Sequence, residues 1–286
     1  MRIGRLTVMA PESAAPPHPR RGDPGVFTWL NLDGTLWGHG FHALGARWLS
    51  FPRVARFRLG AHDAEATAVP DVGADLDAVV DAYRRCVVPM ALHAQGIEVL
   101  HASAVVMPAG VVAFCARART GKSTTAFALS LRGHRLWADD AVPFEFVDDA
   151  PLALPLPFRL RLRRRAGEFF DVRVPPDAFA PMTNGSSGHC DPLPLAGLVL
   201  LERAPKLPSP AEVGRLAPAE ALTSLIEHAY WYDLGEPGRK RLMMERYAEL
   251  VGAIPTWRLV FRSELEGLDE LVGMIEGAVG ASSTTA

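Results

Sequence analysis

Four consecutive residues, Gly121-Lys122-Ser123-Thr124, have the chemistry to hold a phosphate group. A short apolar run at 111–115 precedes them, and a segment with helical spacing follows them to about Arg132. The phosphate-loop pattern is Gly, four residues, then Gly-Lys-Ser/Thr, placed between a strand and a helix. Ala116 stands in place of the first Gly, and the rest of the pattern fits. The spacing therefore predicts a nucleotide-binding loop.

The loop chemistry explains these residue types. Backbone N–H groups at a helix N-terminus attract phosphate oxygens, and Gly121 lets the backbone come close. Lys122 supplies a positive charge for the β- and γ-phosphates, and the Ser123 hydroxyl can bind Mg²⁺. The expected cofactors are therefore ATP or GTP, with Mg²⁺. The expected nucleotide-binding residues are Ala116, Arg117, Ala118, Arg119, Thr120, Gly121, Lys122, Ser123 and Thr124.

The loop carries Arg117 and Arg119 where such loops prefer small residues. A positive φ at Arg119 would cost about 1–2 kcal/mol of strain. The two guanidinium groups could instead reach the triphosphate.

A pair of acids, Asp139-Asp140, ends the next expected strand, 134–138. We expect this strand to lie beside the strand that feeds the loop, so that both end at the sheet edge where ligands of open α/β sheets bind. One carboxylate there can hold Mg²⁺ and another can accept a proton from an attacking hydroxyl. Because neighbouring strand residues point to opposite faces, at most one of the two is expected to aim straight at the metal, unless the strand has already ended. His101, on the strand before the loop, is either a hydrogen-bonded core residue or part of the site.

Composition narrows the class of protein. The chain has 286 residues, of which 49% are hydrophobic and 22% charged, with a net charge of -2. This balance is typical of a soluble globular protein. It lacks the basic excess of nucleic-acid binders, so no nucleic acid is expected as a partner. No apolar run is long enough to span a membrane. Three widely spaced cysteines without a CxxC favour a reducing cytoplasm.

Apolar periodicity divides the chain into two parts. Residues 1–90 are expected to form a β-rich segment with one helix, at 75–93, interrupted near Pro89, and this segment is a candidate for substrate binding. Residues 91–286 are expected to form the α/β catalytic part, a mixed sheet flanked by helices. Its expected strands are 97–107, 111–115, 134–138, 151–165, 195–201 and 256–261, and its expected helices are 121–132, 218–232, 238–252 and 264–279.

The segment LHASAVV, the phosphate loop and the segment KSTTAFALSLRGHRLWADDAV together resemble the catalytic domain of bacterial HPr kinase/phosphorylase. They are closer still to its short relatives, which include the kinases of lasso-peptide precursors and often carry Ala at the position of Ala116. The resemblance covers about 95–146 strongly and later segments diffusely, and the first 90 residues match weakly. The chain departs from the family's small-residue loop at Arg117-Ala118-Arg119.

The resemblance implies a P-loop kinase core of the HPr kinase and PEP carboxykinase type, and transfer of the γ-phosphoryl group to a serine hydroxyl. The acceptor would be a peptide or small protein, in peptide natural-product biosynthesis. His101 falls on the family's active-site His, Asp139 on its catalytic acid/base, and Asp140 on its second acid, near the metal. The expected metal ligands are therefore Ser123 and Asp140. A homo-oligomer is compatible with the sequence.

Other features leave alternatives open. Arg159, Arg161 and Arg163 are either a solvated strand face or a clamp for an anionic group of the substrate. The loop 183–191 is either a mobile lid or a plain connection. A non-catalytic nucleotide-binding regulatory module is the alternative function, which the two loop arginines motivate. A carboxykinase-like lyase is a third, for which the chain looks short.

Overall fold

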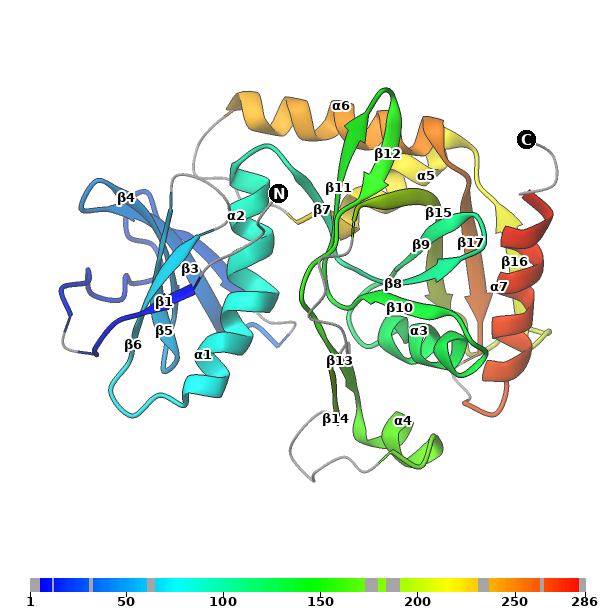
Figure 1. Cartoon of the computed structure of the whole chain (residues 1–286), viewed down its shortest axis with the longest axis horizontal. Coiled ribbons are helices and arrows are strands. Elements are labelled where there is room, and N and C mark those ends of the chain that lie inside the picture. The colour runs from blue at the N-terminus through cyan, green and yellow to red at the C-terminus, as the bar shows by residue number, and fades with distance from the viewer. Residues whose placement is uncertain are drawn as a thin grey trace. The chain divides into compact units, whose positions relative to one another are not determined.

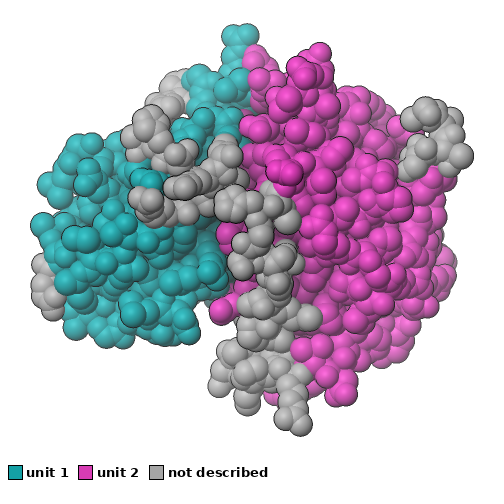
Figure 2. All heavy atoms as spheres, in the orientation of Figure 1, with its two compact units in different colours: residues 1–97, 230–243 teal, residues 98–229, 244–286 magenta. Residues whose placement is uncertain are grey.

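The computed structural model describes residues 6–11, 13–30, 33–60, 65–172, 180–183, 191–230, 237–262 and 265–282. The chain divides into two compact units (Figures 1 and 2). Unit 1 comprises Met1–Ile97 and Tyr230–Met243, and unit 2 comprises Glu98–Ala229 and Met244–Ala286. The first division of the chain thus falls at Ile97, compared with the boundary at residue 90 expected from sequence.

Unit 1 contains a six-stranded sheet in the order β1-β6-β5-β4-β3-β2. All its neighbouring strands are antiparallel except β1 and β6. Residues of β5 alternate between the core and solvent, because side chains along a strand point to opposite faces. The strands are β1 (Leu6–Val8), β2 (Phe27–Leu30), β3 (Leu36–Ala43), β4 (Ala46–Phe51), β5 (Ala55–Leu59) and β6 (Ala66–Pro70).

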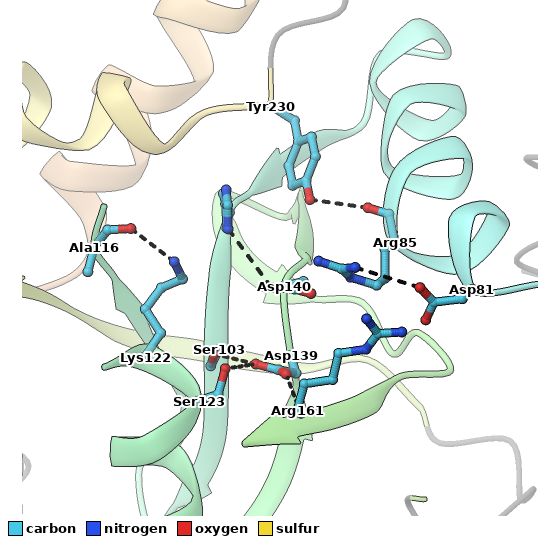
Figure 3. Close-up of polar contacts among 11 residues, drawn as sticks. Asp81, Arg85, Ser103, Ala116, Lys122, Ser123, Asp139, Asp140, Arg161 and Tyr230 are labelled. Carbon is cyan, nitrogen blue, oxygen red and sulfur yellow. Dashed lines mark hydrogen bonds and ion pairs between the residues drawn. The ribbon is translucent and has the colours of Figure 1, made fainter. Parts of the chain in front are cut away.

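The helix of unit 1 is interrupted, as expected, but the irregular turn lies before Pro89. It runs as α1 (Leu76–Ala82), a π-helical turn η1 (Tyr83–Val87) and α2 (Val88–Ala94). Proline has no N–H to donate to the carbonyl one turn earlier, that of Arg85. The Tyr230 hydroxyl donates to this carbonyl at 3.2 Å (Figure 3). A side chain therefore satisfies the acceptor that the proline leaves open.

Unit 2 contains a mixed sheet in the order β10-β8-β9-β15-β12-β11-β7, with β17 paired to β15 and β16 to β17. The expected mixed α/β architecture is therefore confirmed. Strands β9, β15 and β17 are parallel to one another. The strands are β7 (Glu98–Leu100), β8 (Ala102–Met107), β9 (Gly110–Cys115), β10 (Arg135–Ala138), β11 (Val142–Val147), β12 (Ala150–Ala153), β15 (Leu193–Arg203), β16 (Ala211–Arg215) and β17 (Thr256–Phe261).

Helices pack against this sheet through buried apolar side chains. Side chains of α3 and α7 join those of β8, β9, β15 and β17 in a buried cluster that includes Phe114, Leu129 and Ile275. Tyr247 of α6 packs edge-on against Phe144 and donates a hydrogen bond to the carbonyl of Val99 at 2.8 Å. The helices are α3 (Lys122–Leu131), α4 (Arg164–Phe169), α5 (Pro218–Leu225), the 3-10 turn η2 (Ile226–His228), α6 (Pro237–Ala253) and α7 (Leu268–Ser282).

Several expected elements have different bounds. The strand expected at 97–107 breaks at His101, whose N–H donates to the carbonyl of His228 at 2.7 Å instead of a sheet neighbour. The strand expected at 151–165 becomes β12, the separate strand β13 (Arg159–Leu162) and the start of α4. Strand β13 pairs with β14 (Ala180–Thr183), which the sequence did not predict. The helix expected at 218–232 ends at Leu225, followed by η2, and residues 231–232 lie outside the described part.

Gly110 lies where β9 closely approaches β15. Its φ is 134°, and a Cβ there would lie 2.5 Å from the carbonyl oxygen of Pro194. We predict that Gly110→Ala lowers the free energy of unfolding by about 2–4 kcal/mol, because strain adds to the clash. Gly214→Ala is the matched control, since a Cβ there would meet nothing within 4 Å. Equal midpoints for the two variants in urea denaturation would contradict this account.

Candidate functional site

The pairing register brings three chain segments to one edge of the unit 2 sheet. Ala102, which begins β8, lies opposite Cys115, which ends β9. Ala104 of β8 lies opposite Ala138, which ends β10. Strand β8 is antiparallel to both, so β9 and β10 run in the same direction. The expectation that β10 lies directly beside β9 is wrong, because β8 separates them. The expectation that both end at the same edge is confirmed.

The loop after β9 lies between a strand and a helix, as the sequence predicted. Residues 116–121 connect β9 to α3, which begins at Lys122. Gly121 is the N-cap of α3 with a φ of 131°, a value that favours glycine. Arg119 has a φ of 70°. The strain foreseen for an arginine in this conformation is therefore present in the loop.

Lys122 folds back over the loop. Its side chain is buried at 7% exposure, and Nζ donates to the carbonyl oxygen of Ala116 at 3.0 Å (Figure 3). Burial lowers the pKa of Lys122, while the negative charges of Asp140 and Asp139 act in the opposite direction. The ammonium is thus held at the start of α3 by a single carbonyl contact, which an incoming anion could replace.

Asp139 is a buried carboxylate held by three donors. Oδ1 accepts hydrogen bonds from the hydroxyls of Ser103 at 2.6 Å and Ser123 at 2.8 Å (Figure 3). Oδ2 accepts from the backbone N–H of Arg161 at 3.1 Å. Burial, and then the charge of Asp140, raise the pKa of Asp139 to about 6, and the three hydrogen bonds oppose that rise. The carboxylate therefore ties the first turn of α3 to β8 and β13.

Asp140 points away from this cluster, toward His101. The Nε2 atom of His101 lies 4.0 Å from Oδ1 of Asp140, at the limit of an ion pair. The two side chains are 42% and 21% exposed, more than that of Asp139. Asp140 has a φ of 66°, in the left-handed region that aspartate tolerates better than most residues. The two acids thus face different partners, as expected for neighbours at the end of a strand.

The sequence suggested Ser123 and Asp140 as the metal ligands and Asp139 as the proton acceptor. The structure brings all the expected residues to one edge but pairs Ser123 with Asp139. No group of three or more His, Cys, Asp or Glu side chains converges on one point within the described ranges. Among the same residues, no helix is long and apolar enough to cross a membrane.

Sequence reasoning missed three contributors. Ser103 carries no motif, but it lies in β8 two residues after His101. His228 comes from η2, far along the chain, and Ala229 forms a β-bridge with Leu100. Arg203 ends β15, and its Nε donates to the carbonyl oxygen of Thr120 in the loop at 2.8 Å. Only Ser103 had a sequence signal, its spacing from His101.

The other candidates have mixed outcomes. Arg117 of the loop pairs with Glu227 at 3.0 Å, where both side chains are exposed. On β13, Leu160 and Leu162 are fully buried, so the intervening arginines take the other face, and Arg163 has left the strand. Most of the loop 183–191 falls outside the described residues, including residues 184–190.

Comparisons with known proteins give no family. No family model matches the chain, and no curated protein matches it. Among solved structures, the chain is similar to the HPr(Ser) kinase/phosphatase from Coxiella burnetii at 14% identity, with a TM-score of 0.36. That match covers 65% of this chain and 90% of the other. A likeness this distant carries no weight in the assignment of function.

The strained backbone at Arg119 allows a test of the loop geometry. We predict that Arg119→Gly leaves the free energy of unfolding unchanged or raises it by up to about 1 kcal/mol, because relief of strain offsets the added freedom of the unfolded chain. Arg117→Gly is the control, because Arg117 is not among the residues with positive φ. It should lose about 0.5–1.5 kcal/mol through chain entropy and its ion pair. Equal losses in the two variants would rule out strain at Arg119.

His228 should make stability depend on pH. Burial lowers its pKa to about 4, the charges of Lys122 and Arg117 act in the same direction, and Glu227 opposes them. Between pH 6.5 and 4 the unfolded chain therefore binds a proton that the folded chain does not, so this contribution to stability is lost as the pH falls. Thermal melts from pH 7 to 4.5 should show wild type losing several degrees more than His228→Asn. If the melting temperatures of wild type and His228→Asn fell in parallel as the pH decreases, the lowered pKa assigned to His228 would be contradicted.

Proposed function

We propose that this chain binds a nucleoside triphosphate with Mg²⁺ and transfers the γ-phosphoryl group to a serine hydroxyl of a peptide or small protein. The observation that carries the proposal is the hydrogen bond from Ser123 to Asp139 beside the buried ammonium of Lys122. In nucleotide-binding loops, Mg²⁺ is held by the loop Ser/Thr and by an Asp at the end of a nearby strand. Ser123 and Asp139 occupy those two positions relative to β9, α3 and β10.

The residues fit a divalent cation. Mg²⁺ prefers oxygen ligands and is usually bound by one or two carboxylates together with substrate phosphates. Asp139 and Asp140 are adjacent, and the charge of Asp140 disfavours ionisation of Asp139. A cation beside Asp139 would relieve that repulsion. When bound, the ion would neutralise negative charge on the β- and γ-phosphates.

Lys122 and the start of α3 would hold the phosphates. The ammonium would exchange its contact with the carbonyl of Ala116 for a phosphate oxygen. Burial lowers the pKa of Lys122, and a bound anion would raise that pKa again. The attraction between the ammonium and the anion therefore favours the exchange. The N–H groups at the start of the helix add dipoles directed at the same place.

Asp140 and His101 would handle the proton. Asp140 is more accessible than Asp139, and its carboxylate faces His101 rather than Ser123. A general base must reach the hydroxyl of the acceptor. Asp140 would be this base, and His101 beside it would orient the carboxylate. We therefore assign Asp139 to the metal and Asp140, with His101, to the proton. This reverses the roles that the sequence suggested for the two acids. The serine acceptor is supported by the resemblance in 95–146.

Nucleotide binding can be measured by calorimetry with Mg-ATP. Lys122→Ala should raise the dissociation constant at least about tenfold, because it removes a charged contact to phosphate. Lys240→Ala is the control, since Lys240 is exposed and belongs to unit 1, whereas the loop belongs to unit 2. Binding that is equally strong in wild type and both variants would contradict the phosphate-loop assignment.

Transfer of labelled phosphate from ATP to a library of serine-containing peptides separates the two acids. Asp140→Asn should reduce transfer by about 10²–10⁴-fold and leave the affinity for Mg-ATP nearly unchanged. Asp139→Asn should remove most of the gain in nucleotide affinity that Mg²⁺ gives. The opposite pattern would restore the roles suggested by the sequence. Nucleotide binding by wild type without any labelled peptide would favour the regulatory-module alternative.

A further inference from the structure

One face of the unit 1 sheet carries a hollow. Residues that lie directly opposite one another on neighbouring strands share a face of the sheet. Trp48 of β4 lies opposite Arg58 of β5, which in turn lies opposite Thr67 of β6. Phe57, the neighbour of Arg58 along β5, is fully buried and takes the other face. The row of Trp48, Arg58 and Thr67 lines a hollow of about 340 Å³.

The N-terminal segment forms one wall of this hollow. The N–H of Met9 donates to the carbonyl oxygen of Ala68 in β6 at 2.9 Å. Further along, the ring of His18 is hydrogen-bonded to the hydroxyl of Ser50 in β4 at 2.6 Å. Met9 and Ser13 of this segment line the hollow. Because the segment is anchored to two strands of the sheet, the wall is in place before any ligand arrives, which lowers the cost of binding.

Two exposed apolar side chains stand at the rim. Met9 is 44% exposed, and Leu44, in the turn between β3 and β4, is 74% exposed. Leu44 also has a φ of 50°, a conformation that asparagine or glycine adopts at lower cost. Folding alone favours neither the exposure nor the strain at this position. Apolar side chains around a cavity are typical of a site that binds an apolar group.

The floor combines an apolar ring with one positive charge. Trp48 is 3% exposed, and its indole N–H already donates to the carbonyl oxygen of Ala43 at 3.0 Å. The ring therefore offers apolar surface rather than a free donor. Arg58 is exposed and is the only charged side chain among the described residues that line the hollow. A complementary ligand therefore carries a negative charge beside an apolar body.

The size of the hollow indicates what kind of ligand it takes. Its volume lies near the lower end of the range of about 300–1,000 Å³ for ligand pockets. That is room for one large side chain rather than for a long segment of chain. An apolar side chain would lie against Trp48, Met9 and Leu44, and a carboxylate next to it would pair with Arg58. A peptide with both groups close together in sequence meets these requirements.

We propose that this hollow binds the acceptor peptide through one large apolar side chain and a carboxylate next to it. The inference rests on the proposed function, because that function supplies a peptide as acceptor. It makes Arg58 and Leu44 determinants of acceptor specificity, and it separates acceptor recognition in unit 1 from the nucleotide loop in unit 2.

Fluorescence anisotropy of labelled serine-containing peptides, measured without nucleotide, tests the hollow. One peptide carries a leucine next to a glutamate, and two matched peptides replace either the leucine by alanine or the glutamate by lysine. Wild type should bind the first peptide about tenfold more tightly than either matched peptide. Arg58→Glu should abolish the preference for glutamate over lysine. In wild type this preference should weaken as the salt concentration rises.

Two further variants separate binding from folding. Leu44→Asn should keep or raise the melting temperature, because asparagine tolerates positive φ. The same variant should bind the leucine and glutamate peptide about fivefold more weakly, because it removes apolar contact at the rim. Arg84→Glu is the matched control and should bind like wild type, since Arg84 is an exposed arginine of unit 1 that does not line the hollow.

The outcomes separate this inference from the proposed function. If wild type does not distinguish the three peptides, or if Arg58→Glu binds them as wild type does, the inference is overturned, and phosphate transfer by unit 2 is unaffected. Binding that depends on Arg58 without any transfer of labelled phosphate would support the hollow as a peptide site and overturn the proposed function. A dimer that sediments in wild type but not in Leu44→Asn would show that the hollow holds a second copy of the chain, which also overturns the inference.

Discussion

The candidate site depends on one buried carboxylate. Asp139 accepts hydrogen bonds from Ser123 at the start of α3, from Ser103 on β8 and from the backbone of Arg161 on β13. A carboxylate buried in this way is costly unless its lone pairs are satisfied. The three donors come from segments that are distant in sequence, so the carboxylate is satisfied only where the fold brings these segments together. The hydrogen bond from Ser123 to Asp139 also orients the Ser123 hydroxyl beside Lys122.

The surrounding residues show conformations and charges that folding alone does not favour. Arg119 and Asp140 have positive φ, and Lys122 is a buried ammonium. Each of these costs stability, and they gather around one loop at one sheet edge. Strain and uncompensated charge of this kind cluster at sites where a ligand supplies the missing interaction. An anion on the loop and a cation beside Asp139 would together supply it here.

Local patterns in the sequence were sufficient to predict the secondary structure at the centre of this site. The strand, loop and helix around Gly121 depend on nearby residues, so their types and spacing predicted them well. The shared edge for β9 and β10 was also predictable, although the intervening β8 was not, because strand order depends on long-range pairing. The same limit explains the break at His101, since its partner His228 lies far along the chain. Arg203 was missed because nothing in its neighbourhood distinguishes it from a solvated strand end.

The sequence alone could not show which of the two acids, Asp139 or Asp140, faces the loop. Asp139 and Asp140 follow the last residue of β10, and Asp140 has a left-handed backbone, so strand alternation does not set which of them faces the loop. The contacts of Ser123 and Ser103 with Asp139 give the orientation.

The central claim is that Ser123 and Asp139 form a metal position next to phosphates held by the loop. A crystal structure with Mn²⁺ and a non-hydrolysable ATP analogue tests it most directly, because manganese can be located by its anomalous scattering. The account predicts a manganese peak beside Ser123 Oγ and the Asp139 carboxylate, with the phosphates over the N–H groups of Gly121 and Lys122. A nucleotide bound elsewhere, or a peak away from these two side chains, would contradict it.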